Sequence, residues 1–222
     1  LLAVAAQLLP SDVALIHQEH RASSERTAGL EPLLAFGPRA DAIVLLTGDT
    51  RDWLRHQLGD QSPWLDVVPN ALPPGYRPVS TRRHPLIVSA GRFVREKQFT
   101  HLIRAFASVA HQIPDWRLRI YGTGPYQARM TRIIRKTRMF DRVELPGVSS
   151  SMSIEWANAS IAALTSRTEG LPLVVQEAMA AGVPVASYDC PSGPRELIAH
   201  ESTGLLVPSG SEAGMAAALL RL

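Results

Sequence analysis

From residue 85 onward, short apolar runs alternate with segments in which apolar residues recur at helical spacing. In the first helical segment, Leu102, Ile103 and Phe106 share one face, and Pro114 ends the pattern. The apolar runs show no polar alternation, which is typical of parallel strands that are covered by helices on both faces. The pattern therefore predicts an α/β fold with a doubly wound, Rossmann-like parallel sheet.

The strands of this sheet are expected in six segments, with helices or turns between them. These segments are PLIVSAG, WRLRIYGTG, RVELPG, SIAALTS, VPVASY and GLLVP. A helix is expected from Pro172, a favourable first helical residue, to Gly182.

Residues 1–75 carry a weaker version of the pattern, with strands expected in DVALIHQ, ADAIVLLT and LDVVPNALP. This stretch is too short for a complete sheet, so we expect an incomplete second Rossmann-like lobe. The proline-rich stretch Pro69–Pro85 is typical of a linker. We therefore divide the chain into a first lobe (1–75), a linker (76–84) and a second lobe (85–222). Because the chain starts without Met, we expect it to be a fragment.

Composition narrows the class of protein only slightly. An apolar fraction of 45% and a charged fraction of 19% are those of a soluble globular protein. The net charge of +3 is compatible with an anionic small substrate, a membrane surface or nucleic acid, and selects none of them. Cys190 is the only cysteine, so a reducing, cytoplasmic compartment is expected and Cys190 is interpreted as a packing residue. No apolar run reaches the roughly 18–20 residues that span a bilayer.

Four loops follow predicted strands and should meet at one edge of the sheet, where open α/β sheets bind ligands. They are GRFVREK, GTG, SRTEGLP and DCPSGP. In the first loop, the charges of Arg92 and Lys97 together suit a diphosphate. Two solvated cations in an ordinary surface loop would give the same sequence pattern. In the second, Gly122 and Gly124 lack the third glycine of a dinucleotide fingerprint, because Gln127 stands in its place.

Two glutamates, Glu169 and Glu177, lie eight positions apart in TSRTEGLPLVVQEAMAAG. The backbone amides of Gly170 and Leu171 precede a predicted helix and suit an anion. Glu169 beside them could grip hydroxyl groups of a phosphate-bearing ligand, and Glu177 on the helix could grip ribose hydroxyls. On spacing alone, two surface acids explain the pattern equally well.

Taken together, these segments resemble the retaining glycosyltransferases of the GT-B fold, specifically glycosyltransferase family 4. The resemblance covers residues 85 to about 210 and includes an E-x7-E element from Glu169 to Glu177. Its other parts are AGRFVREK, YGTGP, VELPG, YDCPSGPREL and GLLVP. YDCPSGPREL is further similar to the branch that includes poly(glycerol-phosphate) α-glucosyltransferases.

The resemblance implies roles for individual side chains. Arg92 and Lys97 would hold the diphosphate of a nucleotide-sugar donor. Glu169 would contact the sugar hydroxyls, and Glu177 would bind the ribose hydroxyls. In the first lobe, DVALIHQEH resembles an element that lies near the reacting carbon of the sugar. His17 is the first choice for this role because it directly follows the apolar run of the expected strand, and His20 is the second.

The resemblance also implies roles for backbone groups. The amides near the start of the helix would face the sugar and the distal phosphate, and two loops would line the nucleotide base. The first group is Gly170, Leu171 and Leu173, and the second is Gly122–Gly124 with Pro146 and Gly147.

The implied reaction moves a sugar, with UDP favoured over GDP as its carrier, to an acceptor hydroxyl with retained anomeric configuration. The acceptor would be a glycan, a lipid or a polyol-phosphate polymer, so peripheral contact at the inner face of the cell membrane is compatible with the prediction. No cofactor is expected. No metal is expected either, because no D-x-D element is visible and the three candidate ligands between His17 and His20 do not match a zinc signature.

Other functions are compatible with some of the same residues. A non-catalytic nucleotide-sugar-binding module would share Arg92 and Lys97 but would not need His17. Another GT-B enzyme, such as a sugar-nucleotide epimerase, also stays open. A phosphorylase is disfavoured, because this sequence does not show the lysine that such an enzyme needs for pyridoxal phosphate. Nucleic-acid binding is disfavoured, because the basic helix Arg129–Arg138 has no interleaved aromatic residues. Weak nucleotide binding and little turnover are expected of this chain alone.

Overall fold

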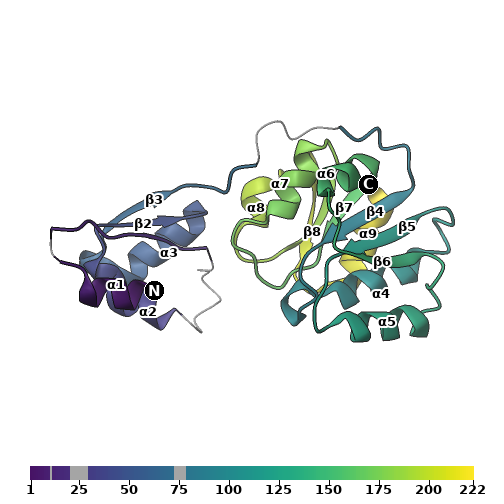
Figure 1. The fold of residues 1–222 in the computed structure, drawn as a ribbon. Helices are drawn as coiled ribbons and strands as arrows, with labels where there is room; N and C mark the ends of the chain where they lie inside the picture. Colours follow the sequence, from purple (N-terminus) through teal and green to yellow (C-terminus); the bar gives the residue numbers. More distant parts are fainter. Residues whose placement is uncertain (11, 21–29, 73–78) are drawn as a thin grey trace. The chain divides into compact units, whose positions relative to one another are not determined.

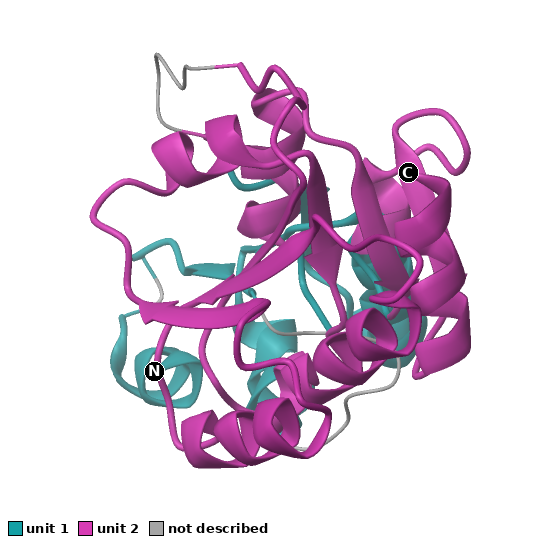
Figure 2. Ribbon diagram, turned by 90° about the vertical axis from the view of Figure 1, so that its right-hand side faces the viewer, with its two compact units in different colours: residues 1–71, 168–171, 191–193 teal, residues 72–167, 172–190, 194–222 magenta. Residues whose placement is uncertain are grey.

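The structure is a computed structural model that describes residues 1–10, 12–20, 30–72 and 79–222. Contacts divide the chain into two compact units (Figure 2). Unit 1 comprises Leu1–Ala71, Thr168–Leu171 and Pro191–Gly193, and unit 2 comprises Leu72–Arg167, Pro172–Cys190 and Pro194–Leu222. Within the expected linker, residues 76–78 lie outside the described residues.

Unit 1 contains a three-stranded parallel sheet in the order β1–β2–β3 (Figure 1). Its strands are β1 (Ile16–Gln18), β2 (Ala42–Leu45) and β3 (Trp64–Val67). Its helices are α1 (Leu2–Leu8), α2 (Glu31–Phe36), α3 (Gly48–Leu58) and the short 3-10 helices η1 (Gly37–Arg39) and η2 (Gly59–Gln61). Ile43 and Leu45 of β2 are fully buried in one core with Leu54 of α3.

Unit 2 contains a six-stranded sheet in the order β6–β5–β4–β7–β8–β9, and every neighbouring pair is parallel. The strands are β4 (Leu86–Ala90), β5 (Arg117–Tyr121), β6 (Val143–Gly147), β7 (Ile161–Leu164), β8 (Val185–Asp189) and β9 (Gly204–Pro208). The helices are η3 (Arg95–Lys97), α4 (Phe99–Val109), α5 (Gln127–Lys136), α6 (Met152–Asn158), α7 (Leu173–Ala180), α8 (Pro194–Leu197) and α9 (Glu212–Arg221).

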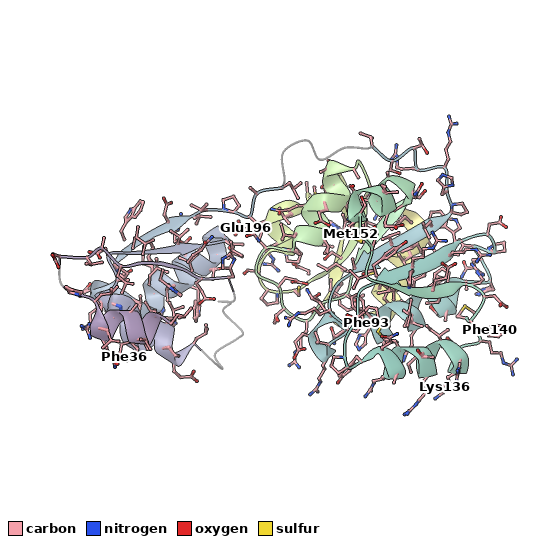
Figure 3. The ribbon with its side chains drawn as sticks, in the orientation of Figure 1. Phe36, Phe93, Lys136, Phe140, Met152 and Glu196 are labelled. Carbon is pink, nitrogen blue, oxygen red and sulfur yellow. The ribbon has the colours of Figure 1, made fainter. Side chains whose placement is uncertain are left out.

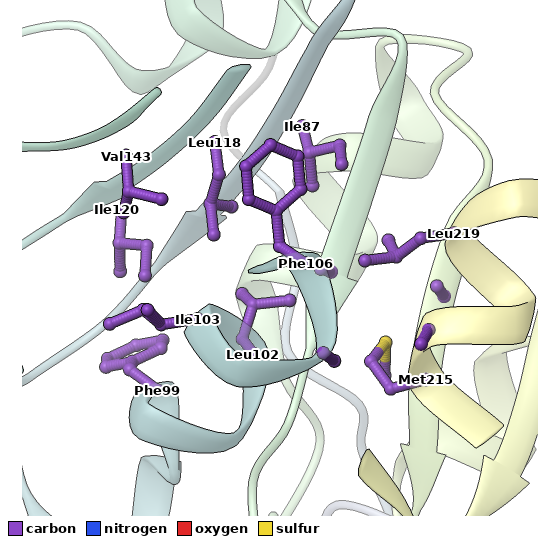
Figure 4. Packing of buried hydrophobic residues seen from close by; sticks show 14 of the residues in the cluster. Ile87, Phe99, Leu102, Ile103, Phe106, Leu118, Ile120, Val143, Met215 and Leu219 are labelled. Atoms are coloured by element: carbon purple, nitrogen blue, oxygen red, sulfur yellow. The ribbon is translucent and has the colours of Figure 1, made fainter. Parts of the chain in front are cut away.

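The two faces of the six-stranded sheet carry separate hydrophobic cores. On one face, α4 and α9 direct side chains such as Phe106 and Met215 toward Ile87 and Leu118 of the sheet (Figure 4). On the other face, α6 and α7 pack over the alternate strand residues, with Trp156 almost fully buried. Because strand side chains alternate between faces, covering both faces requires strands that are apolar throughout.

The predicted doubly wound parallel sheet is therefore confirmed. All five residues of β4 are buried, and its polar member Ser89 donates its hydroxyl hydrogen bond to the Ala163 carbonyl oxygen at 2.7 Å. The helix predicted from Pro172 begins one residue later, because Pro172 has extended backbone angles and serves as the N-cap. The strand predicted in DVALIHQ is shorter than expected and comprises Ile16–Gln18.

Candidate functional site

Three strand ends of unit 2 are joined by backbone hydrogen bonds at one edge of the sheet. After β4, the Phe93 N–H donates to the Thr123 carbonyl oxygen at 2.8 Å. After β5, the Gly122 N–H donates to the Gly147 carbonyl oxygen at the end of β6, at 2.7 Å. Two of the four loops predicted to meet at the carboxyl edge, GRFVREK and GTG, therefore do meet there.

The glycines of the G-x-G pair are required by close backbone packing. Gly122 has a φ of 131°, and a Cβ there would lie 2.0 Å from the Gly91 carbonyl oxygen. At Gly124, φ is 153° and a Cβ would lie 2.6 Å from the Phe93 carbonyl oxygen. Any side chain would collide with the neighbouring loop, so this pair is explained by packing before any ligand is considered.

The two predicted diphosphate ligands both follow β4. Arg92 is exposed, whereas Lys97 is half-buried at the end of η3. The Lys97 side chain runs beside Gly91, because a Cβ on Gly91 would lie 3.5 Å from its Cε atom. The Lys97 carbonyl oxygen also accepts a 3.0 Å hydrogen bond from the Thr165 hydroxyl. These contacts fix the backbone that carries Lys97 between the ends of β4 and β7.

A pocket of about 230 Å³ lies at the carboxyl ends of β4 and β5. Arg92 and Gly122, two of the predicted residues, line it together with Tyr121, Ser149 and Met152 (Figure 3 labels Met152). The wall that these last three residues form was not predicted from the sequence. The pocket is thus bordered by one guanidinium group, that of Arg92, and by the glycines at the ends of β4 and β5.

One wall of this pocket is held by a half-buried hydrogen-bond network around Glu155. The Tyr121 hydroxyl donates to Glu155 Oε2 at 2.5 Å, and the Ser149 hydroxyl donates to Glu155 Oε1 at 3.1 Å. Burial, and next the hydrogen bond to Glu155, raises the pKa of Tyr121 to about 12. Glu155 therefore joins the end of β5 to the loop after β6 and to α6.

Glu177 lies on α7 and is half-buried. Its Oε2 atom accepts a 3.0 Å hydrogen bond from the indole N–H of Trp156 on α6. Trp156 is only 1% exposed, so this donor is held rigidly by the core. A carboxylate that is oriented by one fixed donor keeps its remaining lone pairs in a defined direction.

Glu169 belongs to unit 1 and is held through its backbone. Its N–H donates to the Pro191 carbonyl oxygen at 2.8 Å, and its carbonyl oxygen accepts from the Ser192 N–H at 3.0 Å. These reciprocal bonds join two of the predicted loops, SRTEGLP and DCPSGP. The neighbouring Leu171 is buried, and its carbonyl oxygen accepts from the Asn70 amide at 3.2 Å.

The histidine segment also belongs to unit 1. His17 lies within β1 and not after it, pairing with Ile43 of β2. Its Nε2 atom is 3.4 Å from Oε2 of the buried Glu19. The exposed His20 follows the strand, and a Cβ on Gly170 would lie 2.5 Å from the His20 carbonyl oxygen. Both histidines therefore stay candidates, with His20 the one whose backbone adjoins the glutamate loop.

The remaining predicted residues fall close to those already described. Pro146 and Gly147 end β6, and Gly147 has a φ of 87° that favours glycine. Leu173, the first residue of α7, is exposed.

Across the described ranges, no helix is long and apolar enough to cross a membrane.

Comparison with known proteins identifies a family for most of the chain. Residues 78–222 match the family described as Glycosyl transferases group 1. An exopolysaccharide phosphotransferase of Streptomyces coelicolor is 45% identical over 223 residues, covering 100% of this chain and 24% of the relative. A poly(glycerol-phosphate) alpha-glucosyltransferase of Bacillus subtilis is 25% identical over 199 residues, covering 87% of this chain and 29% of the relative.

Solved structures share the fold. The pneumococcal O-GlcNAc transferase GtfA, in complex with UDP and GlcNAc, matches with a TM-score of 0.84 and 21% identity. The match covers 100% of this chain and 47% of that one. This chain thus spans about a quarter of the two curated relatives and about half of the solved structure.

Proposed function

The chain belongs to the group 1 glycosyltransferase family, and from that membership we propose that it binds a nucleotide-diphosphate sugar for a retaining, metal-independent sugar transfer. UDP is the proposed carrier. The observation that carries the proposal is the pocket at the carboxyl ends of β4 and β5, where Arg92 stands beside the glycine loops. A nucleotide base can lie along such backbone while its diphosphate reaches a guanidinium.

Each part of the nucleotide sugar is assigned its own contacting residues. The base lies against Gly122–Gly124 and the end of β6, and the diphosphate reaches Arg92 and Lys97. Glu177 accepts hydrogen bonds from the ribose hydroxyls, and its fixed bond from Trp156 supports this role by holding the carboxylate in one direction. The sugar and distal phosphate meet Glu169 and the amides of Gly170, Leu171 and Leu173.

The reaction breaks the bond between the anomeric carbon and the diphosphate oxygen and joins that carbon to the acceptor oxygen. Negative charge grows on the leaving diphosphate, where Arg92 and Lys97 stabilise it. Glu169 orients the sugar, and His17 or His20 lies near the reacting carbon. The leaving phosphate oxygen takes the acceptor proton on the same face, so the configuration is retained and neither glutamate acts as a nucleophile.

The proposed acceptor is a hydroxyl group of a glycan, a lipid or a polyol-phosphate polymer. The name of the B. subtilis relative supports the last of these. Because the chain spans about a quarter of that relative and of the Streptomyces one, we expect little turnover from the 222 residues alone. Transfer at the rate of a complete enzyme would contradict this expectation.

Thermal unfolding with a panel of UDP, GDP, ADP and their sugars tests the donor proposal. UDP and UDP-sugars should raise the unfolding temperature most, because at equal concentration the ligand with the lowest Kd stabilises the folded protein most. A ligand at 100 times its Kd stabilises by about 2.7 kcal/mol. Arg92→Ala should weaken UDP binding about ten-fold through the loss of a charge-assisted contact. The matched control is Arg95→Ala, three residues further along the chain and outside the pocket, which should leave UDP binding unchanged. Equal effects of the two substitutions would contradict the proposed site.

A second candidate is a nucleotide-sugar-binding module without catalysis of its own. The name of the Streptomyces relative favours this candidate, because it describes a phosphotransferase and not a sugar transferase. This chain covers 24% of that relative. Replacing His17 and His20 in a full-length parent separates the two functions. Lost transfer with intact nucleotide binding supports catalysis, whereas nucleotide binding without any sugar transfer by the unsubstituted parent supports the module. Incubating the parent with UDP-sugars alone and looking for an epimerised product tests the epimerase alternative.

A further inference from the structure

A second pocket of about 460 Å³ lies at the carboxyl edge of the same sheet, beside the starts of α4 and α5. Three arginines line it: Arg95 in η3, Arg129 on α5 and Arg167 after β7. It shares no residue with the 230 Å³ pocket that contains Arg92. The loop after β4 contributes to both pockets, with Gly91 and Arg92 in the smaller one and Val94 and Arg95 in the larger one.

Among the described residues, the larger pocket is lined by positively charged side chains and by no aspartate or glutamate. Arg95, Arg129 and Arg167 are exposed, and within the described part of the chain none of them forms an ion pair. The Arg129 guanidinium lies 5.8 Å from the centre of the Tyr126 ring, which also lines the pocket. Arg167 is held by its backbone, since its N–H donates to the Glu96 carbonyl oxygen at 2.7 Å. Three guanidinium groups around one hollow present many donors and suit the oxygen atoms of a phosphate.

Gln98 adds a hydrogen-bond acceptor to the same pocket. Its Oε1 atom is shielded from solvent, and no donor among the described residues reaches it. A buried carbonyl oxygen without a donor is costly, so it is most stable when a bound molecule supplies one. A hydroxyl group close to the phosphate of a ligand would meet this need.

We propose that this pocket binds a hydroxylated phosphate, with the three guanidinium groups on the phosphate oxygens and Gln98 Oε1 accepting from a ligand hydroxyl. The ligand class is a polyol phosphate or sugar phosphate, either free or as the repeating unit of a phosphodiester polymer. The site is separate from the proposed donor site, so the inference holds whether or not the chain binds UDP.

Binding of glycerol 3-phosphate to the 222-residue chain, measured by calorimetry with and without saturating UDP, tests the proposal. UDP should not displace glycerol 3-phosphate. Arg95→Ala and Arg129→Ala should each weaken binding about three- to ten-fold, since charge-assisted contacts to exposed guanidinium groups are partly screened. Arg135→Ala on the same helix is the matched control, because Arg135 is exposed and lies outside the pocket.

Inorganic phosphate separates the role of Gln98 from that of the arginines. Gln98→Leu should reduce binding of glycerol 3-phosphate and leave binding of inorganic phosphate unchanged. An oligomer of glycerol phosphate that binds more tightly than the monomer would identify a polymer as the source of the ligand, whereas equal affinity per site would identify the free metabolite.

Three results would overturn the proposal. They are displacement of glycerol 3-phosphate by UDP, equal weakening by Arg129→Ala and Arg135→Ala, or tighter binding of a single-stranded oligonucleotide than of glycerol phosphate. Arg92→Ala distinguishes this failure from failure of the donor proposal, because it should affect UDP alone. Circular dichroism of each variant confirms that the chain remains folded.

Discussion

Two regions of unit 2 are held together by different kinds of contact. The loops at the ends of β4, β5 and β6 are joined by backbone hydrogen bonds and leave no room for a Cβ at Gly122. Helices α6 and α7 are joined instead through side chains, with Trp156 donating to Glu177. A backbone contact is lost outright when a side chain intrudes, whereas a side-chain contact can be weakened by degrees. The loops should therefore tolerate substitution least, and the helices should allow the site to be tuned.

The largest effect should come from Gly122→Ala in the loop region. The backbone conformation costs about 1–3 kcal/mol for a residue other than glycine. The collision with the Gly91 carbonyl oxygen adds about 1–3 kcal/mol of overpacking. Urea unfolding should show a much lower free energy of unfolding, and failure to obtain folded protein would be the extreme form of the same result.

Gly210→Ala is the matched control for the loop region. Gly210 also has a positive φ, of 81°, but a Cβ there would meet nothing within 4 Å. It should therefore show only the conformational part of the loss. If the two substitutions cost the same free energy of unfolding, the close approach of the loops is unimportant and the comparison fails.

An intermediate effect should come from Trp156→Phe in the helical region. Phenylalanine keeps an aromatic ring in the core but removes the indole N–H, which leaves Glu177 without its donor at a cost of about 1–3 kcal/mol. The free energy of unfolding should fall by that amount, and UDP binding should weaken without being abolished.

A double-mutant cycle between Trp156→Phe and Glu177→Ala isolates the contact. Two groups in direct contact should show a coupling free energy of about 0.5–3 kcal/mol, in both unfolding and UDP binding. Coupling in unfolding alone would mean that the hydrogen bond supports the fold and does not position Glu177 for a ligand.

The smallest effect concerns the pH dependence of stability at Tyr121. Its pKa in the folded protein is raised from 10.0 to about 12, first by burial and then by the hydrogen bond to Glu155. The folded state thus holds this proton more tightly, so the stabilisation is complete below pH 10 and is lost as pH rises toward about 12. Tyr121→Phe should unfold with a smaller loss of stability over this interval, measured by thermal melts at stepped pH.

Tyr188 provides an internal reference for that measurement. Burial, followed by the charge of Glu212, raises the pKa of Tyr188 to about 12 as well. Its contribution should persist in Tyr121→Phe, so the pH dependence should shrink and not vanish. A variant with an unchanged pH dependence would show that the Tyr121 network does not hold the pocket wall.

The sequence predicted the fold of unit 2 better than that of unit 1. The strand β4 is buried on both faces, so its continuous apolar run identifies a strand clearly in the sequence. By contrast, β1 lies at the edge of its sheet, and Ile16 is 66% exposed. An exposed edge strand of three residues leaves little pattern in the sequence, and its limits were accordingly missed.

For the site, the sequence predicted positions but not partners. The rule that parallel strand ends share one edge correctly brought together the loops after β4 and β5, which are joined by the hydrogen bond from the Phe93 N–H to the Thr123 carbonyl oxygen. Trp156 and Glu177 lie 21 residues apart, and their contact depends on the packing of α6 beside α7. No ligand was predicted for the basic helix that begins at Arg129, yet Arg129 lines a pocket, because helix spacing does not show what the neighbouring loops enclose.

Unit 1 is not a continuous piece of chain, because it includes Thr168–Leu171 and Pro191–Gly193 from within the sequence of unit 2. Since domains generally fold as they leave the ribosome, the first unit cannot be completed until residue 193 has been synthesised. A single crossover near residue 72 between two related genes would combine Thr168–Leu171 and Pro191–Gly193 of one protein with the first 71 residues of the other. Functional chimeras should therefore require the exchange of all three segments together.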